Sequence, residues 1–407
     1  MLSESTLQNL IQAIVDRQEN INTWVIKKIA KRIREIGEVL PSDVNQLDRL
    51  LKTGSDVRLI NQEISRLTGI QLSSIQDLIR TVAEDAYLDT EPFFNYRKLP
   101  FVPFEENKQL QNVVKAIARQ TSDTYRNLSK AQAFMLRDPA NPQILKPTPI
   151  ADAYQSVVDE AVQASQGGVV DYRTAMRKTM RQLVDSGIRS VTYNTETGRI
   201  YTQRLDTAVR RNVLDGIRAI NQGVQDEVGK QFGANGKEIT VHACPAPDHE
   251  DLQGRQFSNE EFEKLQNEEP FKDYTGKQFT PVARAIGTCN CRHFTFSVIL
   301  GVNKPTHSQE ELKKIIDAND KGYTLPNGKH LTMYECTQMQ RKLETQVRKA
   351  KDGQIAARTA GDMELAKKYQ KQINEKQAEY IAFSNACGLQ PMKMKMTVSG
   401  YRKISTK

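Results

Sequence analysis

The sequence predicts a mainly α-helical fold with a small α+β core, and three features of the chain carry this prediction. Apolar residues recur at intervals of three and four through most of the first half, which is helical spacing. Between residues 187 and 305 the pattern changes to the alternation typical of strands. From residue 306 onwards charged helical sequence returns. Because 407 residues exceed one usual domain, we expect four regions: 1–90, 91–186, 187–305 and 306–407.

The first region is predicted to be a small helical bundle. One helix covers residues 7–36, behind a Ser/Thr-rich start. Two shorter helices cover residues 44–51 and 59–67, and the Thr68-Gly69 pair is expected to end the second of them. The spacing also resembles a helix-turn-helix. No cluster of base-reading Arg, Asn or Gln accompanies it, which favours the plain bundle.

Two proline-rich breaks interrupt the helices of the second region. The break from Asp138 to Pro149 has four prolines and is expected to be an extended connector. The break from Glu91 to Phe104 is too apolar for a free linker, so we expect it to pack down or to bind a partner. Its candidate partner-binding residues are Phe93, Phe94, Tyr96, Phe101 and Phe104. Helices are predicted for residues 108–135, 150–164 and 171–186.

The third region is predicted to be a small α+β core that contains two clusters of histidine and cysteine. A hairpin at residues 190–202 and a helix from Asp206 come before strands at 238–244 and 291–300. Strand alternation would put positions 242 and 244 on one face, and positions 289, 291 and 293 likewise if that segment is extended. Two such faces could offer zinc its nitrogen and sulfur donors. The spacing matches no regular zinc finger, so a metal-free cluster around a turn stays open as the alternative. The six residues are His242, Cys244, His249, Cys289, Cys291 and His293.

The same segment resembles the phage minor capsid protein 2 family, which is related to head-morphogenesis proteins like the F protein of phage Mu. The family pattern has a first histidine, a Pro-x-His step, a Trp-or-Leu-Gln-Gly element and a terminal Asn-Cys-Arg-His. All of these occur here in order, as His242, Pro247-Asp-His249, Leu252-Gln-Gly254 and Asn290-Cys-Arg-His293. Residues 334–351 and 380–389 are similar to the family's long charged helix and to the segment that ends it. The resemblance covers about residues 187–390.

The resemblance implies a structural metal site and a place in the virion. It implies a low-copy minor capsid protein that is bound near the portal inside the head, assists head assembly and catalyses no reaction. The expected partners are the portal protein, packaged DNA and a major capsid or scaffold protein, and the protein is expected in the host cytoplasm during assembly. The matching residues form a complete set of zinc ligands, with Cys244 and Cys289 as runners-up. They are His242, His249, Cys291 and His293.

The positive charge of the chain is concentrated at its end. Residues 1–300 hold 38 basic and 38 acidic side chains, whereas residues 301–407 hold 20 and 11. Such a bias indicates a polyanion partner such as DNA, and a solubilising tail is the alternative. Residues 392–398 alternate apolar and basic side chains, which predicts a strand with its lysines on one face. The candidate DNA-contacting residues are Lys393, Lys395, Arg402, Lys403 and Lys407.

Two other functions compete with the capsid interpretation. A metal-dependent nuclease could use Asp248 and His249, but such a metal usually keeps an open position and oxygen ligands, whereas sulfur and imidazole predominate here. A zinc-containing nucleic-acid-binding regulator would explain the charge and the metal but not the long helical first half. The sequence has no phosphate loop, nucleophile elbow or apolar run of membrane-spanning length, so neither an enzyme nor a membrane protein is expected. Cys336 and Cys387 are expected to be buried thiols.

Overall fold

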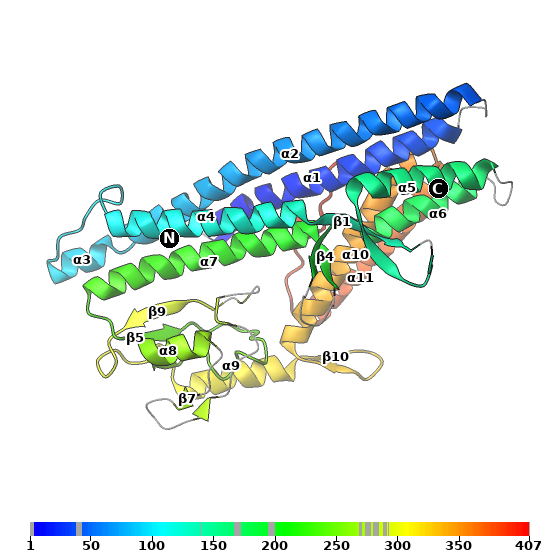
Figure 1. The fold of residues 1–407 in the computed structure, drawn as a ribbon. Helices are drawn as coiled ribbons and strands as arrows, with labels where there is room; N and C mark the ends of the chain where they lie inside the picture. Colours follow the sequence, from blue (N-terminus) through cyan, green and yellow to red (C-terminus); the bar gives the residue numbers. More distant parts are fainter. Residues whose placement is uncertain are drawn as a thin grey trace. The chain divides into compact units, whose positions relative to one another are not determined.

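The computed structural model of the chain is mostly helical with small antiparallel sheets, which confirms the predicted fold class (Figure 1). Contacts group the chain into two compact units, each assembled from three separate segments. Unit 1 contains Met1–Ile11, Ser73–Thr124 and Arg211–Gln338, and unit 2 contains Gln12–Leu72, Tyr125–Arg210 and Met339–Lys407. The four sequential regions stay a prediction. The structure describes residues 4–37, 43–138, 140–166, 172–193, 200–267, 271–272, 278–279, 285–287, 291 and 293–406.

The first two helices are long and uninterrupted. Helix α1 (Glu4–Gly37) confirms the predicted N-terminal helix. Helix α2 is continuous over Asp43–Leu88, so the predicted break at Thr68-Gly69 is wrong, and a helix-turn-helix is excluded there. A glycine inside a helix costs only about 1 kcal/mol relative to alanine. Thr68 lies within the helix, and its Oγ1 donates to the carbonyl of Ile64 at 2.7 Å.

Helices α4 and α7 pack closely against each other in unit 1. Helix α4 spans Lys108–Lys130 and helix α7 spans Leu205–Gln231 (Figure 1). A Cβ at Gly216 of α7 would lie 2.5 Å from Oγ1 of Thr121 on α4. Asn212 adds a buried hydrogen bond from its Nδ2 to the carbonyl of the same threonine, at 3.0 Å. The glycine therefore permits an approach of the two backbones that a larger residue would prevent.

A three-stranded antiparallel sheet of order β6-β5-β9 lies in unit 1 next to the histidine and cysteine clusters. The predicted strands at 238–244 and 291–300 exist but are shorter, because β5 ends at Ile239 and β9 begins at Thr295. Pro245 and Pro247 follow β5 and cannot donate ladder hydrogen bonds. The expected strand alternation of the metal ligands is therefore wrong, and the described ligands lie in loops beside the sheet. The bounds are β5 (Gly236–Ile239), β6 (Gln256–Ser258) and β9 (Thr295–Val298).

The remaining elements of unit 1 are short. Helix α8 begins with a capping box in which Ser258 and Glu261 satisfy each other's backbone amides, and it packs on the sheet through Phe262 and Leu265. Helix α9 begins with the same device at Ser308. The bounds are α8 (Asn259–Gln266), β7 (Phe271–Lys272), β8 (Gln278–Phe279), α9 (Gln309–Lys321), β10 (Tyr323–Thr324) and β11 (His330–Leu331).

Unit 2 contains a four-stranded antiparallel sheet of order β2-β1-β3-β4, with α5 and α6 beside it (Figure 1). The predicted hairpin is confirmed as β3 and β4, and its turn lies outside the described residues. Residues 132–149 form a second hairpin, so the predicted connector is wrong, and the helix predicted over 108–135 ends at Lys130. Pro147 and Pro149 fit strand β2 because it lies at the sheet edge. The bounds are β1 (Gln132–Arg137), β2 (Leu145–Pro149), α5 (Ile150–Gln166), α6 (Tyr172–Ser186), β3 (Arg189–Tyr193) and β4 (Ile200–Arg204).

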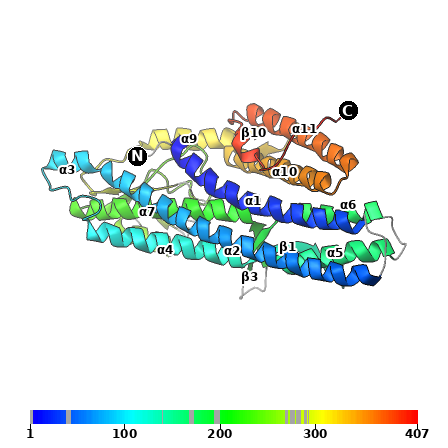
Figure 2. The ribbon, with the colours of Figure 1, turned by 90° about the horizontal axis from the view of Figure 1, so that it is seen from above.

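Two helices that lie side by side confirm the predicted C-terminal helical segment (Figure 2). Helix α10 (Met333–Thr359) and helix α11 (Met363–Ala386) are joined by a turn at Gly361, whose φ of +78° favours glycine. The predicted strand at 392–398 is wrong, since residues 393–396 form a 3-10 helix. Its carbonyls bind side chains of α10 instead of a neighbouring strand. Nζ of Lys351 donates to the Met396 carbonyl at 2.6 Å.

Candidate functional site

Loops of unit 1 bring together three of the predicted metal ligands. The amide of Thr240 donates to the carbonyl of Phe294 at 2.9 Å, which extends the pairing of β5 and β9 towards the loops that follow and precede them. His249, Cys291 and His293 meet beside this pairing, and all three are buried. Their potential ligand atoms all lie within 4.8 Å of one another. The sequence prediction that the two clusters meet is therefore confirmed for these three residues.

The three side chains fit a zinc ion in geometry and in chemistry. Sγ of Cys291 lies 3.3 Å from Nδ1 of His249 and 3.3 Å from Nδ1 of His293. Tetrahedral zinc with ordinary bond lengths separates a sulfur ligand from a nitrogen ligand by about 3.5 Å. The group offers imidazole nitrogen and thiolate sulfur, which are the usual donors of structural zinc sites. The buried triad can therefore hold a metal ion.

The surroundings of Cys291 favour its thiolate form. Burial raises the pKa of the thiol, but hydrogen bonds to His249 and His293 outweigh burial and lower the pKa to about 5. The backbone of Gly287 acts in the same direction. A thiolate is the form of cysteine that binds metals.

Two further polar side chains lie beside the Nε2 atoms of the histidines, and the sequence analysis assigned neither of them to the site. Nε2 of His293 lies 3.4 Å from Oε1 of Gln253, and Nε2 of His249 lies 3.7 Å from Oδ2 of Asp248. Each contact leaves Nδ1 directed towards Cys291, as in sites where a second polar group fixes the ligand ring. The available signal was the Leu-Gln-Gly element, which contributes Gln253. Gly254 of the same element has a φ of +70°, which explains why glycine suits that position.

The other predicted ligands that the structure describes do not belong to the group formed by His249, Cys291 and His293. The ring of His242 lies 4.3 Å from the ring of His293, measured between centroids, so it is next to the triad without belonging to it. Cys244 is half-buried and also outside the triad. Cys289 lies outside the described residues. The choice of His242 as the fourth ligand stays a prediction.

The aromatic break of unit 1 divides into buried and exposed side chains. Part of it forms helix α3 (Glu91–Arg97) rather than the expected irregular stretch, with a proline in its first turn. Phe94 is buried edge-on against Phe101 and Phe232, with ring centroids 5.3 and 4.9 Å apart. Phe101 also stacks on Tyr87, and Phe104 is buried. By contrast, Phe93 is 63% exposed and Tyr96 is 84% exposed.

Side chains of α10 bind backbone carbonyls of the basic end of unit 2, and most of the charged side chains of this end are exposed. Gln354 donates from Nε2 to the carbonyl of Arg402 at 2.7 Å. Of the predicted DNA-contacting residues, Lys393, Arg402 and Lys403 are exposed and Lys395 is partly exposed. Lys407 lies outside the described residues.

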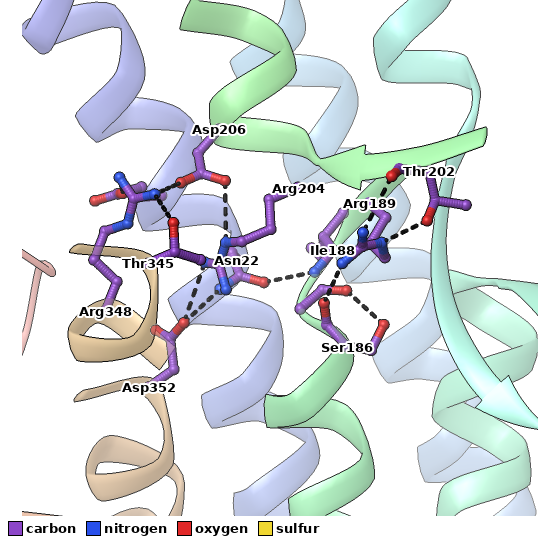
Figure 3. A network of polar contacts seen from close by, with 12 residues as sticks. Asn22, Ser186, Ile188, Arg189, Thr202, Arg204, Asp206, Thr345, Arg348 and Asp352 are labelled. Carbon is purple, nitrogen blue, oxygen red and sulfur yellow. Dashed lines mark hydrogen bonds and ion pairs between the residues drawn. The ribbon is translucent and has the colours of Figure 1, made fainter. Parts of the chain in front are cut away.

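Unit 2 also contains a buried group of charged residues that sequence reasoning missed (Figure 3). We call Glu19, Arg204, Asp206, Arg348 and Asp352 the charge network. Arg204 pairs with Asp206 at 3.2 Å and with Asp352 at 3.4 Å. Arg348 lies 3.4 Å from Asp206 and 3.6 Å from Glu19. The five residues come from α1, β4, α7 and α10, so they join distant parts of the chain within one unit.

Burial and unequal pairing shift the pKa values of the three carboxyls in opposite directions. Burial raises the pKa of Glu19 to about 8, although Arg348 opposes the change. Burial also raises the pKa of Asp352. For Asp206 burial acts in the same direction, but Arg204 and Arg348 outweigh it and hold the pKa well below its usual range. The network therefore contains one firmly ionised carboxylate between two arginines.

Comparison with known proteins supports the resemblance described above and extends it. A family model described as phage minor capsid protein 2 matches residues 2–385, so the match includes the N-terminal half as well as the region with the histidine and cysteine motifs. No curated protein and no solved structure matches the chain. Within the described residues, no helix has both the length and the apolar character needed to span a membrane. Since the family model covers nearly the whole sequence, the chain belongs to the phage minor capsid protein 2 family.

Proposed function

We propose that this virion protein is a non-catalytic part of the phage head that docks on the portal from the inside. The observation that carries the proposal is that α3 has both buried and exposed aromatic side chains. Phe94 anchors the helix against Phe101 and Phe232, while Phe93 and Tyr96 on the same helix are exposed to solvent. Large aromatic side chains presented on a fixed backbone are typical anchors of protein interfaces.

The structure of the segment also lowers the cost of binding. Lys98 ends α3 in the left-handed conformation, with a φ of 54°, and Tyr87 donates from its hydroxyl to the carbonyl of Val102 at 2.9 Å. These contacts fix the backbone on which Phe93 and Tyr96 are carried. A partner that binds them therefore loses little free energy to the ordering of this segment.

Portal binding can be measured by co-purifying the full chain with purified portal rings. We expect the double variant Phe93→Ala, Tyr96→Ala to weaken association by at least about 30-fold, since interface anchors contribute roughly 2 kcal/mol or more. Tyr201→Ala is the matched control, because Tyr201 is 55% exposed on β4 of unit 2. Equal association of all three proteins would contradict the docking site.

We further propose that one structural zinc stabilises the loops of unit 1, held by His242, His249, Cys291 and His293. The support is the buried donor set and its spacing. A bound structural zinc contributes on the order of 10 kcal/mol to the folding of a small site. The sulfur and imidazole donors favour this role over that of a nuclease metal with an open position.

We propose finally that the basic end contacts packaged DNA through phosphate groups. The support is the exposure of Lys393 and Lys403 on a backbone that α10 fixes in place. The variant Lys393→Gln, Lys403→Gln should bind random duplex DNA more weakly and with a shallower salt dependence. The log–log slope should become shallower by about 0.9 for each phosphate that the variant no longer neutralises. Unchanged slopes would show that these lysines only solubilise the chain.

A further inference from the structure

Unit 2 contains a pocket that is lined by none of the predicted site residues. Its volume is about 280 Å³, and it lies where the end of α6, strands β3 and β4, the start of α7 and the middle of α10 meet. Three cationic side chains line it, together with one carboxylate and several hydroxyl groups. The charged lining residues are Asp185, Arg189, Arg204 and Lys349.

Arg189 places a fixed guanidinium group in the lining of the pocket (Figure 3). Its guanidinium is held by Thr202, whose Oγ1 accepts from Nε at 2.9 Å and whose carbonyl accepts from Nη2 at 3.1 Å. The carbonyl of Ser186 accepts from Nη1 at 3.5 Å. Within the described part of the chain no carboxylate forms an ion pair with Arg189. A guanidinium has five N–H donors, so this partly buried cation keeps donors for a ligand.

The other two cations that line the pocket, Arg204 and Lys349, are already paired with carboxylates, so Arg189 is the cation of the lining without an ion pair among the described residues. Arg204 is bound to Asp206 and Asp352 on the side of the charge network. At the rim, Nζ of Lys349 lies 3.1 Å from Oδ1 of Asp185, and both side chains are substantially exposed. An anion can compete for Lys349 because exposed ion pairs contribute little.

The first turn of α7 contributes a hydroxyl group to the lining. Thr207 lines the pocket from that turn of the 27-residue helix, in which the carboxylate of Asp206 offsets the partial positive charge of the amide groups. A fixed guanidinium, a lysine and hydroxyl donors around a small polar space suit a tetrahedral oxyanion better than an apolar ligand. We propose that this pocket binds a phosphate group. The inference goes beyond the proposed function, because it assigns a ligand to a pocket outside the zinc site, α3 and the basic end.

The test measures the affinity of the full chain for two probes, inorganic phosphate and a short random DNA duplex, at constant ionic strength. Arg189→Gln should weaken phosphate binding by at least about tenfold, because a hydrogen bond to a charged group contributes roughly 1.5–3 kcal/mol. Arg189→Lys should recover part of the affinity, since it keeps the charge but not the fork of donors. Lys349→Gln, at the surface rim, should also weaken binding.

Lys368→Gln provides the matched control, because Lys368 is an exposed lysine paired with Glu364 at 3.3 Å on α11, away from the pocket lining. Weaker binding of both probes by Arg189→Gln and Lys349→Gln, but not by Lys368→Gln, would show that the pocket takes a phosphate of nucleic acid. Weaker binding of inorganic phosphate alone would show that it takes the free ion. If the wild-type chain shows no saturable phosphate binding, or if both pocket variants bind both probes like the control, the proposal is wrong. Because Lys349→Gln alters only a surface pair, loss of folding in Arg189→Gln would not remove the test.

Discussion

Replacement of Glu19 with glutamine is expected to flatten the pH dependence of folding stability between pH 4.5 and pH 8. Burial raises the pKa of this carboxyl from 4.5 to about 8, and Arg348 only partly opposes the change. In the unfolded chain the group loses its proton near pH 4.5, whereas the folded protein keeps it until about pH 8. The folded state therefore binds more protons in this window, and the free energy of unfolding must fall as pH rises through it.

The size of the effect follows from the same two pKa values. Each pKa unit corresponds to 1.36 kcal/mol, so Glu19 should lower the free energy of unfolding by on the order of 5 kcal/mol across the window. Typical domains have only about 5–15 kcal/mol in total. Asp352, whose pKa is also raised, acts in the same direction. Asp206 does not contribute in this window, because its lowered pKa removes stability only as pH falls below its unfolded pKa near 3.8.

The assay is urea unfolding of wild type and Glu19→Gln at several values between pH 5 and pH 8. Subtracting one curve from the other leaves the contribution of Glu19 together with that of Asp206 and Asp352, whose charges act on it. The variant should match wild type near pH 5 and exceed it by several kcal/mol at pH 8. Glu379→Gln, an exposed change on α11, serves as the control and should follow the wild-type curve. Parallel curves for Glu19→Gln and wild type would refute the assignment of a protonated Glu19.

Metal analysis should find one zinc per chain in wild type and none in Cys291→Ser, and chelation should abolish cooperative melting of unit 1. Zinc retained by Cys291→Ser but lost by Cys244→Ser would contradict the proposed ligands. Gly216→Ala should lower the free energy of unfolding by about 1–3 kcal/mol, because its Cβ would overlap Thr121. Gly69→Ala should raise it by up to about 1 kcal/mol in the same urea measurement, since a Cβ there meets no atom within 4 Å. Equal stabilities of these two glycine variants would disprove the packing argument.

Local patterns predicted most of the helices and part of the candidate metal site. The periodicity of residues 7–36 predicted α1 almost to its ends, and the charged sequence after residue 306 predicted that α10 and α11 are helical. The prediction failed at Gly69, because a single glycine is a weak signal that a long helix overrides. It also failed at residues 132–149, since that hairpin is completed by pairing with β3, which lies far along the sequence.

The candidate metal site shows the same division between local and long-range information. The spacing of Cys291 and His293 marked them as ligands, although the strand geometry first assigned to them is wrong. The roles of Gln253 and Asp248 depend on how loops fold around the rings, which no spacing reveals. The charge network left no pattern at all, because its members are charged residues scattered along three segments and only the packing of unit 2 buries them together.

The three-segment composition of unit 2 has a consequence for how the protein is made. Its first segment ends at residue 72 and its last begins at residue 339, and translation proceeds at about 5–20 residues per second. Roughly 15 to 65 s therefore pass between the synthesis of Glu19 and that of Arg348, before the two can meet. During that time the apolar side of α1 lacks its final neighbours, which favours chaperone binding to the nascent chain. A premature stop before residue 339 would leave unit 2 without its last segment, and with it without Arg348 and Asp352 of the charge network.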